Sequence, residues 1–170
     1  MSDTSDPCYI AALRILKYRF NSEAELRRKL RGKKFEKEAI DATIVRLHSE
    51  KWLDDERFAG AFVRTKANRR LGSRRILSEL HHAGVSNEAA AQAVVENIDP
   101  EREAEALRAL CAKRAGVLIR RHGADFLRTG EGRNKLAGYL LKQGYDAALV
   151  YARVDEIARE LRVVDHQPDS

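Results

Sequence analysis

The feature that most constrains this chain is a spacing of apolar residues that occurs three times. Equivalent positions lie 50 residues apart between the first two copies and 60 apart between the second and third, with no gap inside any copy. The three sets are Leu26, Leu30, Phe35, Ile40 and Ile44; Ile76, Leu80, Val85, Ala90 and Val94; and Leu136, Leu140, Tyr145, Val150 and Val154. Self-similarity at this period is typical of tandem repeat proteins, so we expect one structural unit used three times.

Local signals predict three helices in the first copy. Ser22 and Glu25 form a capping box that starts a helix ending near Gly32. A helix of about 9–18 precedes it, and a helix of about 36–48 follows with a continuous apolar stripe.

The second copy carries equivalent start and stop signals. Asp54 and Asp55 are suited to cap a first helix, and Ser73 is expected to cap the next one. Gly84 supplies a left-handed stop. The first copy has Lys34 at that position, so we expect the chain to leave this helix through a different backbone conformation.

The third copy begins with Asp99, a cap, followed by Pro100 at the first helical position. Its first helix is expected to reach about His122, and a looser segment over 123–132 accounts for the ten extra residues. Gly144 repeats the stop role of the second copy.

These signals predict an all-α protein of three tandem three-helix, helix-turn-helix-like repeats in an elongated, curved array. No period-two strand pattern of useful length occurs. The expected organisation is a disordered N-terminus, three repeats and a flexible C-terminal tail, over 1–7, 8–52, 53–98, 99–162 and 163–170. One unit of this size buries little apolar surface, so neighbouring units should share packing. Phe58, Phe62 and Trp52 are expected to pack the first junction.

Composition excludes several classes of protein. The acidic, polar N-terminus lacks the features of a signal peptide, and no apolar run is long enough to span a membrane. Two cysteines do not make a disulfide framework, which fits a reducing compartment, so a cytoplasmic protein is expected. Cys111 lies in an apolar run and is interpreted as a packing residue, whereas Cys8 has no sequence neighbour that marks it as a nucleophile.

Motifs for catalysis, metals or cofactors are absent from the sequence. Gly32-Lys33-Lys34 lacks the remaining residues of a P-loop, and Gly130-Glu131-Gly132 follows no predicted strand. The five histidines show no i, i+4 pair, and no Cys-x-x-Cys motif accompanies them, which argues against a zinc site. We therefore expect a binding protein and no enzyme.

The net charge of +6 is concentrated in the first two copies. Ten basic residues and three acidic ones lie from Arg14 to Lys37, and six basic residues without an acid lie from Arg64 to Arg75. A third, thinner group runs from Arg114 to Lys135. Solvated helix faces explain single clusters, but three clusters at equivalent repeat positions favour a surface for an anionic partner.

The third helices of the second and third copies lack this basic bias. The segment 87–97 carries Glu88 and Glu96 and no basic residue, and 146–161 is net acidic. A helix that enters the major groove needs basic or amide side chains, so sequence-specific reading of duplex DNA is disfavoured.

The run Leu53–Ala59, with Gly72–Ile76 and Gly84–Val85, resembles the RecX family of regulatory proteins. Further similar positions are Ser22–Leu26, Leu30, Glu79, Leu80, Lys135, Leu136, Tyr139, Leu140, Gly144 and Tyr145. The resemblance spans about Cys8 to Leu161. It implies tandem three-helix repeats that bind along the RecA filament and limit its ATPase, strand-exchange and co-protease activities, with no cofactor.

The expected partner is therefore the RecA recombinase filament, with single- or double-stranded DNA as a possible second partner, and a monomer is expected. The residues predicted to contact the partner are Arg27, Arg28, Arg31, Lys66, Arg69, Arg70, Arg74 and Arg75. The last four form the densest acid-free group. The alternative is a nucleic-acid-binding protein that acts mainly through backbone contacts to DNA or RNA.

Overall fold

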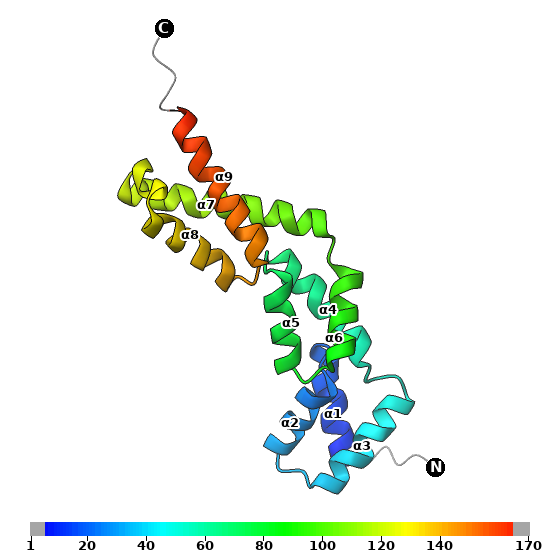
Figure 1. Cartoon of the computed structure of the whole chain (residues 1–170). Helices are drawn as coiled ribbons and strands as arrows, with labels where there is room; N and C mark the ends of the chain where they lie inside the picture. Colours follow the sequence, from blue (N-terminus) through cyan, green and yellow to red (C-terminus); the bar gives the residue numbers. More distant parts are fainter. Residues whose placement is uncertain (1–5, 165–170) are drawn as a thin grey trace. The chain divides into compact units, whose positions relative to one another are not determined.

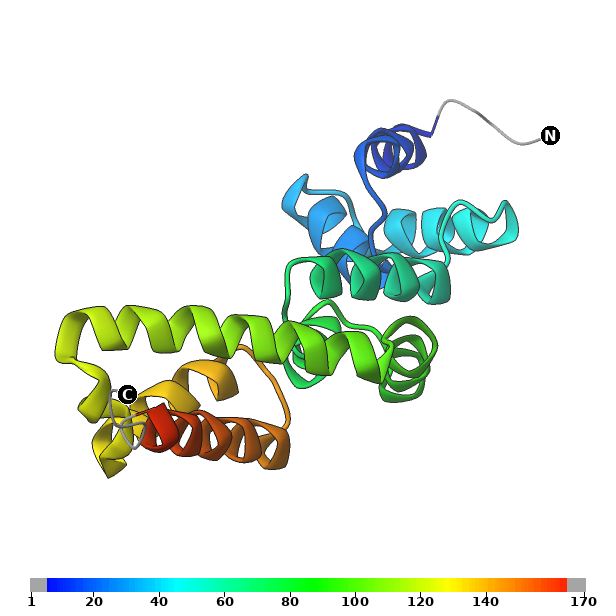
Figure 2. The same ribbon diagram turned by 90° about the horizontal axis from the view of Figure 1, so that it is seen from above.

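The computed structural model describes residues 6–164, and every regular element in that range is helical (Figures 1 and 2). The elements are α1 (Pro7–Tyr18), α2 (Glu23–Gly32), α3 (Lys37–Ser49), α4 (Asp55–Asn68), α5 (Ser73–His82), α6 (Asn87–Asn97), α7 (Pro100–His122), the 3-10 helix η1 (Ala124–Arg128), α8 (Gly130–Lys142) and α9 (Ala147–Val164). Within these residues no helix is long and apolar enough to cross a membrane.

The helix boundaries confirm the three-helix repeat. The second helices α2 and α5 begin at Glu23 and Ser73, which are 50 residues apart. The third helices α3, α6 and α9 begin at Lys37, Asn87 and Ala147, so they repeat the spacings of 50 and 60 residues. Of the apolar positions that defined the repeat, all are buried except Phe35 and Val94, which are half-buried. The expected unstructured ends lie mostly at 1–5 and 165–170, outside the described residues.

The backbone forms two compact units. The first unit comprises the residues up to Arg64 together with Leu77–Asn97, and the second comprises Thr65–Ile76 together with the residues from Ile98 onward. Helices α4 and α5 of the middle repeat therefore contribute to both units. The division into repeats at 8–52, 53–98 and 99–162 follows the helices and stays a prediction.

The core of the first unit lies among α1, α2 and α3. Leu26, Leu30 and Leu47 are fully buried there. Each such side chain contributes roughly 1.5–3 kcal/mol through removal of its apolar surface from water. Tyr9 is also buried, and the Arg46 guanidinium lies 3.7 Å from the centre of its ring.

The core of the second unit lies among α7, α8, α9 and η1. Leu118, Leu127, Leu136 and Tyr145 pack together, and Figures 1 and 2 show α8 and α9 lying against α7. The expected looser segment after α7 is the 3-10 helix η1. A Cβ at Gly132 would overlap the Phe126 carbonyl, so only glycine permits this close approach of α8 to η1.

The turns after the three second helices share one backbone conformation. Gly84 has φ 82°, Gly144 has φ 90° and Lys34 has φ 66°. The expectation that Lys34 needs a different exit is therefore wrong. The turns at Lys34 and Gly84 share this conformation because the same hydrogen bond closes both of them. The Phe35 amide donates to the Leu30 carbonyl, and the Val85 amide donates to the Leu80 carbonyl. A lysine in this left-handed region costs roughly 1 kcal/mol, which the turn tolerates.

The helix caps were predicted with mixed success. Asp99 and Asp54 cap α7 and α4, since their carboxylates accept hydrogen bonds from Glu101 N at 2.9 Å and Arg57 N at 2.9 Å. Ser73 is wrong as a cap, because it is the first residue of α5 and its own amide is capped by another side chain.

The first capping box is half formed. Ser22 accepts a hydrogen bond from Glu25 N at 3.1 Å, as predicted. The Glu25 carboxylate lies 3.2 Å from the Arg19 guanidinium, so it pairs with that cation.

The prediction for Trp52 is wrong, because its side chain is 58% exposed. Phe58 is buried and Phe62 is half-buried beside it, with ring centres 5.7 Å apart. The two phenylalanines of α4 therefore pack at this position without the tryptophan.

Candidate partner-binding surface

The eight predicted contact residues fall into two groups. Arg27, Arg28 and Arg31 lie on α2 in the first unit. The remaining five, Lys66, Arg69, Arg70, Arg74 and Arg75, surround the turn between α4 and α5 in the second unit. Both groups belong to segments whose ends are fixed by contacts with the following repeat.

The start of α2 is held by the second repeat. The Ser22 hydroxyl donates to the Ala83 carbonyl, and the Glu23 amide donates to the Asp55 carboxylate at 2.8 Å. A Cβ at Gly84 would overlap the Cβ of Ala24, so α2 lies directly on this turn. Asp55 was predicted to cap its own helix α4, but it caps α2 instead.

The start of α5 is held by the third repeat in an equivalent way. The Gly72 amide donates to the Gln143 carbonyl at 2.9 Å, and the Arg74 amide donates to the Gly144 carbonyl at 3.1 Å. The Ser73 amide donates to the Glu103 carboxylate of α7 at 2.7 Å. Glu103 therefore does for α5 what Asp55 does for α2. Sequence reasoning found neither role, because the partners lie 30 and 32 residues away.

Arg27 is engaged within the protein. Its guanidinium lies 2.7 Å from the Glu23 carboxylate and also contacts Asp41. Hydrogen bonds to these two carboxylates raise the pKa of Arg27. A partner would have to compete with both acids for this side chain.

Glu23 is itself part of a small charged network. Burial alone would raise the pKa of Glu23, but hydrogen bonds from His48 and Arg27 outweigh this effect and lower it. The His48 Nε2 lies 2.7 Å from the Glu23 carboxylate. This network fixes the inner side of α2 and leaves the outer side to Arg28 and Arg31.

Arg70 is positioned by a buried tyrosine. Its backbone has φ 60°, and its carbonyl accepts a hydrogen bond from the Tyr145 hydroxyl at 2.9 Å. Burial raises the pKa of Tyr145 to about 12, so this donor keeps its proton at physiological pH. The turn that carries Arg69 and Arg70 is thus tied to the third repeat, while both side chains are exposed.

Arg74 and Arg75 are partly engaged. The Arg74 guanidinium is 64% exposed and lies 2.6 Å from the Asp146 carboxylate. Arg75 is half-buried, and its guanidinium donates to the Lys142 carbonyl at 3.4 Å. Exposed ion pairs of the Arg74 type contribute about 0–1 kcal/mol, so an anionic partner can displace Asp146.

Four of the predicted residues present their charges to solvent without neutralisation. Within residues 6–164, no hydrogen bond or ion pair engages the guanidinium groups of Arg28, Arg31, Arg69 and Arg70, and all four residues are exposed. They are the strongest candidates for contact with an anionic surface.

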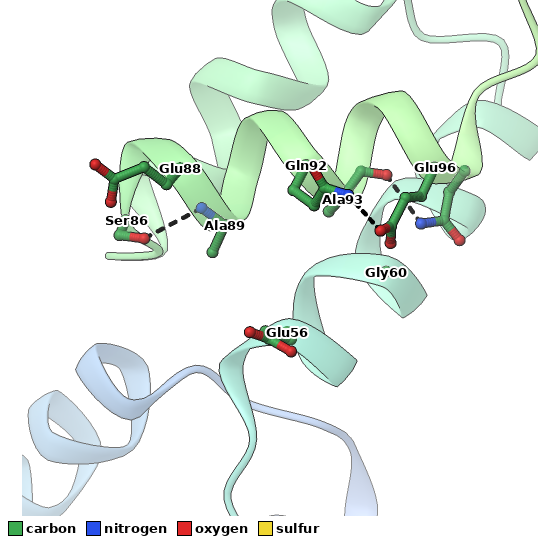
Figure 3. Close-up of a pocket in the computed structure, with 9 residues that line it drawn as sticks. Glu56, Gly60, Ser86, Glu88, Ala89, Gln92, Ala93 and Glu96 are labelled. Carbon is green, nitrogen blue, oxygen red and sulfur yellow. Dashed lines mark hydrogen bonds between the residues drawn. The ribbon is translucent and has the colours of Figure 1, made fainter.

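A groove between α4 and α6 is acidic, in contrast to the four exposed arginines (Figure 3). Its volume is about 570 Å³, and its lining includes Glu56, Glu88 and Glu96. Gln92 donates to the Glu96 carboxylate at 2.5 Å, as a dashed line in Figure 3 marks. The third helix of the middle repeat therefore repels polyanions, in agreement with the sequence argument against a recognition helix. Among the described residues no group of His, Cys, Asp and Glu is arranged to hold a metal ion.

Both cysteines are buried. Burial raises the pKa of Cys111 to about 11 and also raises the pKa of Cys8. A thiol that stays protonated at neutral pH is a poor nucleophile. Cys111 is fully buried in the core of the second unit, which confirms its predicted packing role.

Comparison with known proteins identifies the family. Residues 8–47 match the first three-helix domain of RecX, and residues 54–94 match the second. Regulatory protein RecX of Amycolatopsis mediterranei (strain U-32) is 32% identical over 147 residues, which cover 86% of this chain and 80% of the relative. The chain belongs to the RecX family. Regulatory protein RecX of Escherichia coli (strain SE11) is 34% identical over 145 residues, covering 79% of this chain and 81% of the relative.

Solved RecX structures share the fold. The crystal structure of RecX from Lactobacillus salivarius has a TM-score of 0.70 at 26% identity and covers 92% of this chain and 95% of that one. A second crystal structure, of regulatory protein RecX, has a TM-score of 0.73 at 24% identity, covers 88% of this chain and 70% of that one, and supports the fold alone. The shared name of the RecX relatives describes a regulatory protein and names no reaction.

Proposed function

We propose that this protein binds the filament that RecA recombinase forms on DNA and limits the ATPase, strand-exchange and co-protease activities of that filament. Membership of the RecX family supports the identity of the partner. In this proposal the protein acts in the cytoplasm as a monomer, by binding alone, and serves DNA repair and the SOS response.

The exposed cations suggest the surface that it uses. Arg28, Arg31, Arg69 and Arg70 carry charges that no carboxylate neutralises within the described residues. Arg28 and Arg31 lie on α2, whose start is held by hydrogen bonds to Ala83 and Asp55. Arg69 and Arg70 lie in a turn that is held by the Tyr145 hydroxyl. The backbone that carries these arginines therefore needs little ordering when an anionic surface binds. Tandem repeats also allow several weak contacts to act together, because each contact raises the effective concentration of the next.

The experiment is a titration of RecA-catalysed, single-stranded-DNA-dependent ATP hydrolysis with this protein, beside its affinity for the same DNA alone. We expect inhibition at substoichiometric amounts, with weak binding to the bare DNA. Failure to inhibit at any ratio would contradict the proposal.

The double variant Arg69→Glu/Arg70→Glu tests the surface. We expect the concentration needed for half-inhibition to rise at least about tenfold, because two attractive contacts become repulsive. The control is Arg108→Glu/Lys113→Glu, which changes the net charge equally on exposed positions of α7 outside the three basic groups. An equal loss in both variants would show that net charge alone is responsible.

The alternative function is nucleic-acid binding through backbone contacts to DNA or RNA, which the net charge of +6 favours. In that case DNA binding should be tight, and inhibition should appear only when the DNA is saturated. The logarithm of the DNA affinity should also fall linearly with the logarithm of salt concentration, by about 0.9 for each phosphate contact.

A further inference from the structure

The structure contains two seats of the same design. We use the word seat for the surface on which the start of a second helix is docked. Each seat belongs to the repeat that follows this helix. It consists of the turn after that repeat's own second helix and the first turn of its first helix. The turn at Gly84 with Asp55 of α4 receives α2, and the turn at Gly144 with Glu103 of α7 receives α5.

The first repeat has the corresponding parts, but in the described residues they border an open groove. A groove of about 520 Å³ lies between α1 and the Lys33–Phe35 turn and is lined by Pro7, Ile10, Ala11, Arg14, Lys33 and Phe35. A smaller adjoining hollow of about 230 Å³ shares Ala11, Arg14 and Lys33 and extends along α1 to Ile15 and Tyr18. The same combination of turn and first helix therefore forms a third, uncovered seat.

The chemistry of this groove differs from that of the covered seats. Asp55 is the first residue of α4 and Glu103 is the fourth of α7, and each accepts a helix amide. The first and fourth residues of α1 are Pro7 and Ile10, which are apolar. The charges come from Arg14 and Lys33, and none of the lining residues is acidic. A guest must therefore bring apolar side chains and carboxylates.

A second copy of this chain does not fit by the repeat geometry. Lys34 has the same backbone conformation as Gly84 and Gly144, but its Cβ occupies the space where the incoming helix comes closest at the other two turns. The start of α8, which would be the incoming helix, is already packed against η1 through Gly132. A second copy therefore cannot dock its α8 on the turn at Lys34 in the way that α2 and α5 dock on the other two turns.

Single-stranded nucleic acid is also a poor match. Stacking of bases requires aromatic faces, and most of the groove is aliphatic. Tyr18 is 87% exposed at one end, and Phe35 is half-buried in the repeat core. Apolar lining with two cations is typical of grooves that bind an amphipathic peptide segment.

We propose that the groove between α1 and the Lys33–Phe35 turn binds an acidic amphipathic segment of a partner protein. The segment places an apolar side chain against Ile10 and Phe35, and its carboxylates pair with Arg14 and Lys33. This site is separate from the four exposed arginines and does not depend on the filament proposal.

The test uses the full chain and a fluorescein-labelled peptide of about 15 residues, with Leu on one helical face and Glu on the other. Fluorescence anisotropy should show saturable binding at physiological salt. A scrambled peptide of the same composition should bind at least about tenfold more weakly, because it lacks the apolar face.

The variant Arg14→Glu/Lys33→Glu should weaken binding of the peptide at least about tenfold, and Ile10→Asn should weaken it about fivefold. The matched variant Arg108→Glu/Lys113→Glu should change it less than about twofold. These side chains are exposed or half-buried, and a thermal melt checks that each variant is folded.

Four results would overturn the proposal. They are equal losses in the two double variants, equal affinity for the scrambled peptide, displacement of the peptide by a thymidine oligonucleotide that binds more tightly, and a large gain in peptide affinity when residues 1–5 are removed. The last would assign the groove to the chain's own N-terminal segment. None of these results bears on inhibition of RecA, so the two proposals can fail independently.

Discussion

The turns at Gly84 and Gly144 and the turn at Lys34 have the same backbone conformation, yet only the first two are covered by another helix. At the covered turns a Cβ would overlap Ala24 or Arg75, whereas Lys34 is exposed to solvent. Positive φ alone therefore does not require glycine here. Glycine is required at the two turns on which the preceding repeat is docked, because a Cβ would overlap the docked helix. The turn of the first repeat has no docked helix, and a residue with a Cβ is tolerated there.

The largest effect should come from adding a Cβ at a covered turn. In Gly144→Ala the new methyl group would overlap the backbone nitrogen and Cβ of Arg75. We expect the free energy of unfolding to fall by about 4 kcal/mol, from strain at positive φ and displacement of a helix start. Urea unfolding measures the loss, and hydrogen exchange should accelerate in α8 and α9.

Gly84→Ala separates the two causes. Its methyl group meets only the Cβ of Ala24, so we expect a loss of about 3 kcal/mol. Ala24→Gly removes that overlap, and the double variant should recover about 1 kcal/mol relative to the sum of the single changes. A purely additive result would mean that φ strain, and not the docked helix, makes glycine necessary.

A smaller effect should come from the carboxylate that completes the first covered seat. Asp55→Ala leaves the Glu23 amide without its acceptor and should cost about 1 kcal/mol. Asp55→Asn keeps an oxygen acceptor and should cost less than about 0.5 kcal/mol. An Asn variant as unstable as the Ala variant would show that the charge, rather than the hydrogen bond, is what holds α2.

The pH dependence of the same site has a defined sign. Burial raises the pKa of Asp55, so the folded protein binds its proton more readily than the unfolded chain. This group's contribution to stability therefore increases as pH falls through the raised pKa and decreases as pH rises. The difference in stability between the natural protein and Asp55→Asn should shift in favour of the natural protein as the pH falls toward the ordinary pKa of an aspartate, about 3.9.

The sequence predicted the elements of the fold well because each repeat is specified locally. Apolar spacing, Ser22, Asp54 and Asp99 placed helices to within a few residues of their observed bounds. Local patterns carry this information because helix periodicity and capping involve residues three or four apart.

The connections between repeats could not be read in the same way. Asp55 and Glu103 act on amides of distant helices, and both could equally have capped the helices on which they lie. Arg27 looked like its neighbours on α2, but Asp41 on α3 neutralises part of its charge. The exposed arginines could be predicted from the clusters of basic residues along the sequence. The groove beside Lys33 could not, because it depends on which turn lacks a docked helix, and that is a property of the tertiary structure.

The smallest effect, and the sharpest test of the comparison, should come from Lys34→Gly. Glycine relieves the left-handed strain of about 1 kcal/mol but adds freedom to the unfolded chain, so we expect a net gain of about 0.5 kcal/mol in unfolding by urea. Lys33→Gly, at φ −88°, is the matched control and should lose a similar amount, because it has no strain to relieve. Sedimentation should also show that Lys34→Gly has the same oligomeric state as the natural protein, since the start of α8 is still packed against η1. A larger assembly in Lys34→Gly than in the natural protein would mean that the Cβ of Lys34 alone prevents a second copy from binding to the first repeat, and that η1 does not block the start of α8.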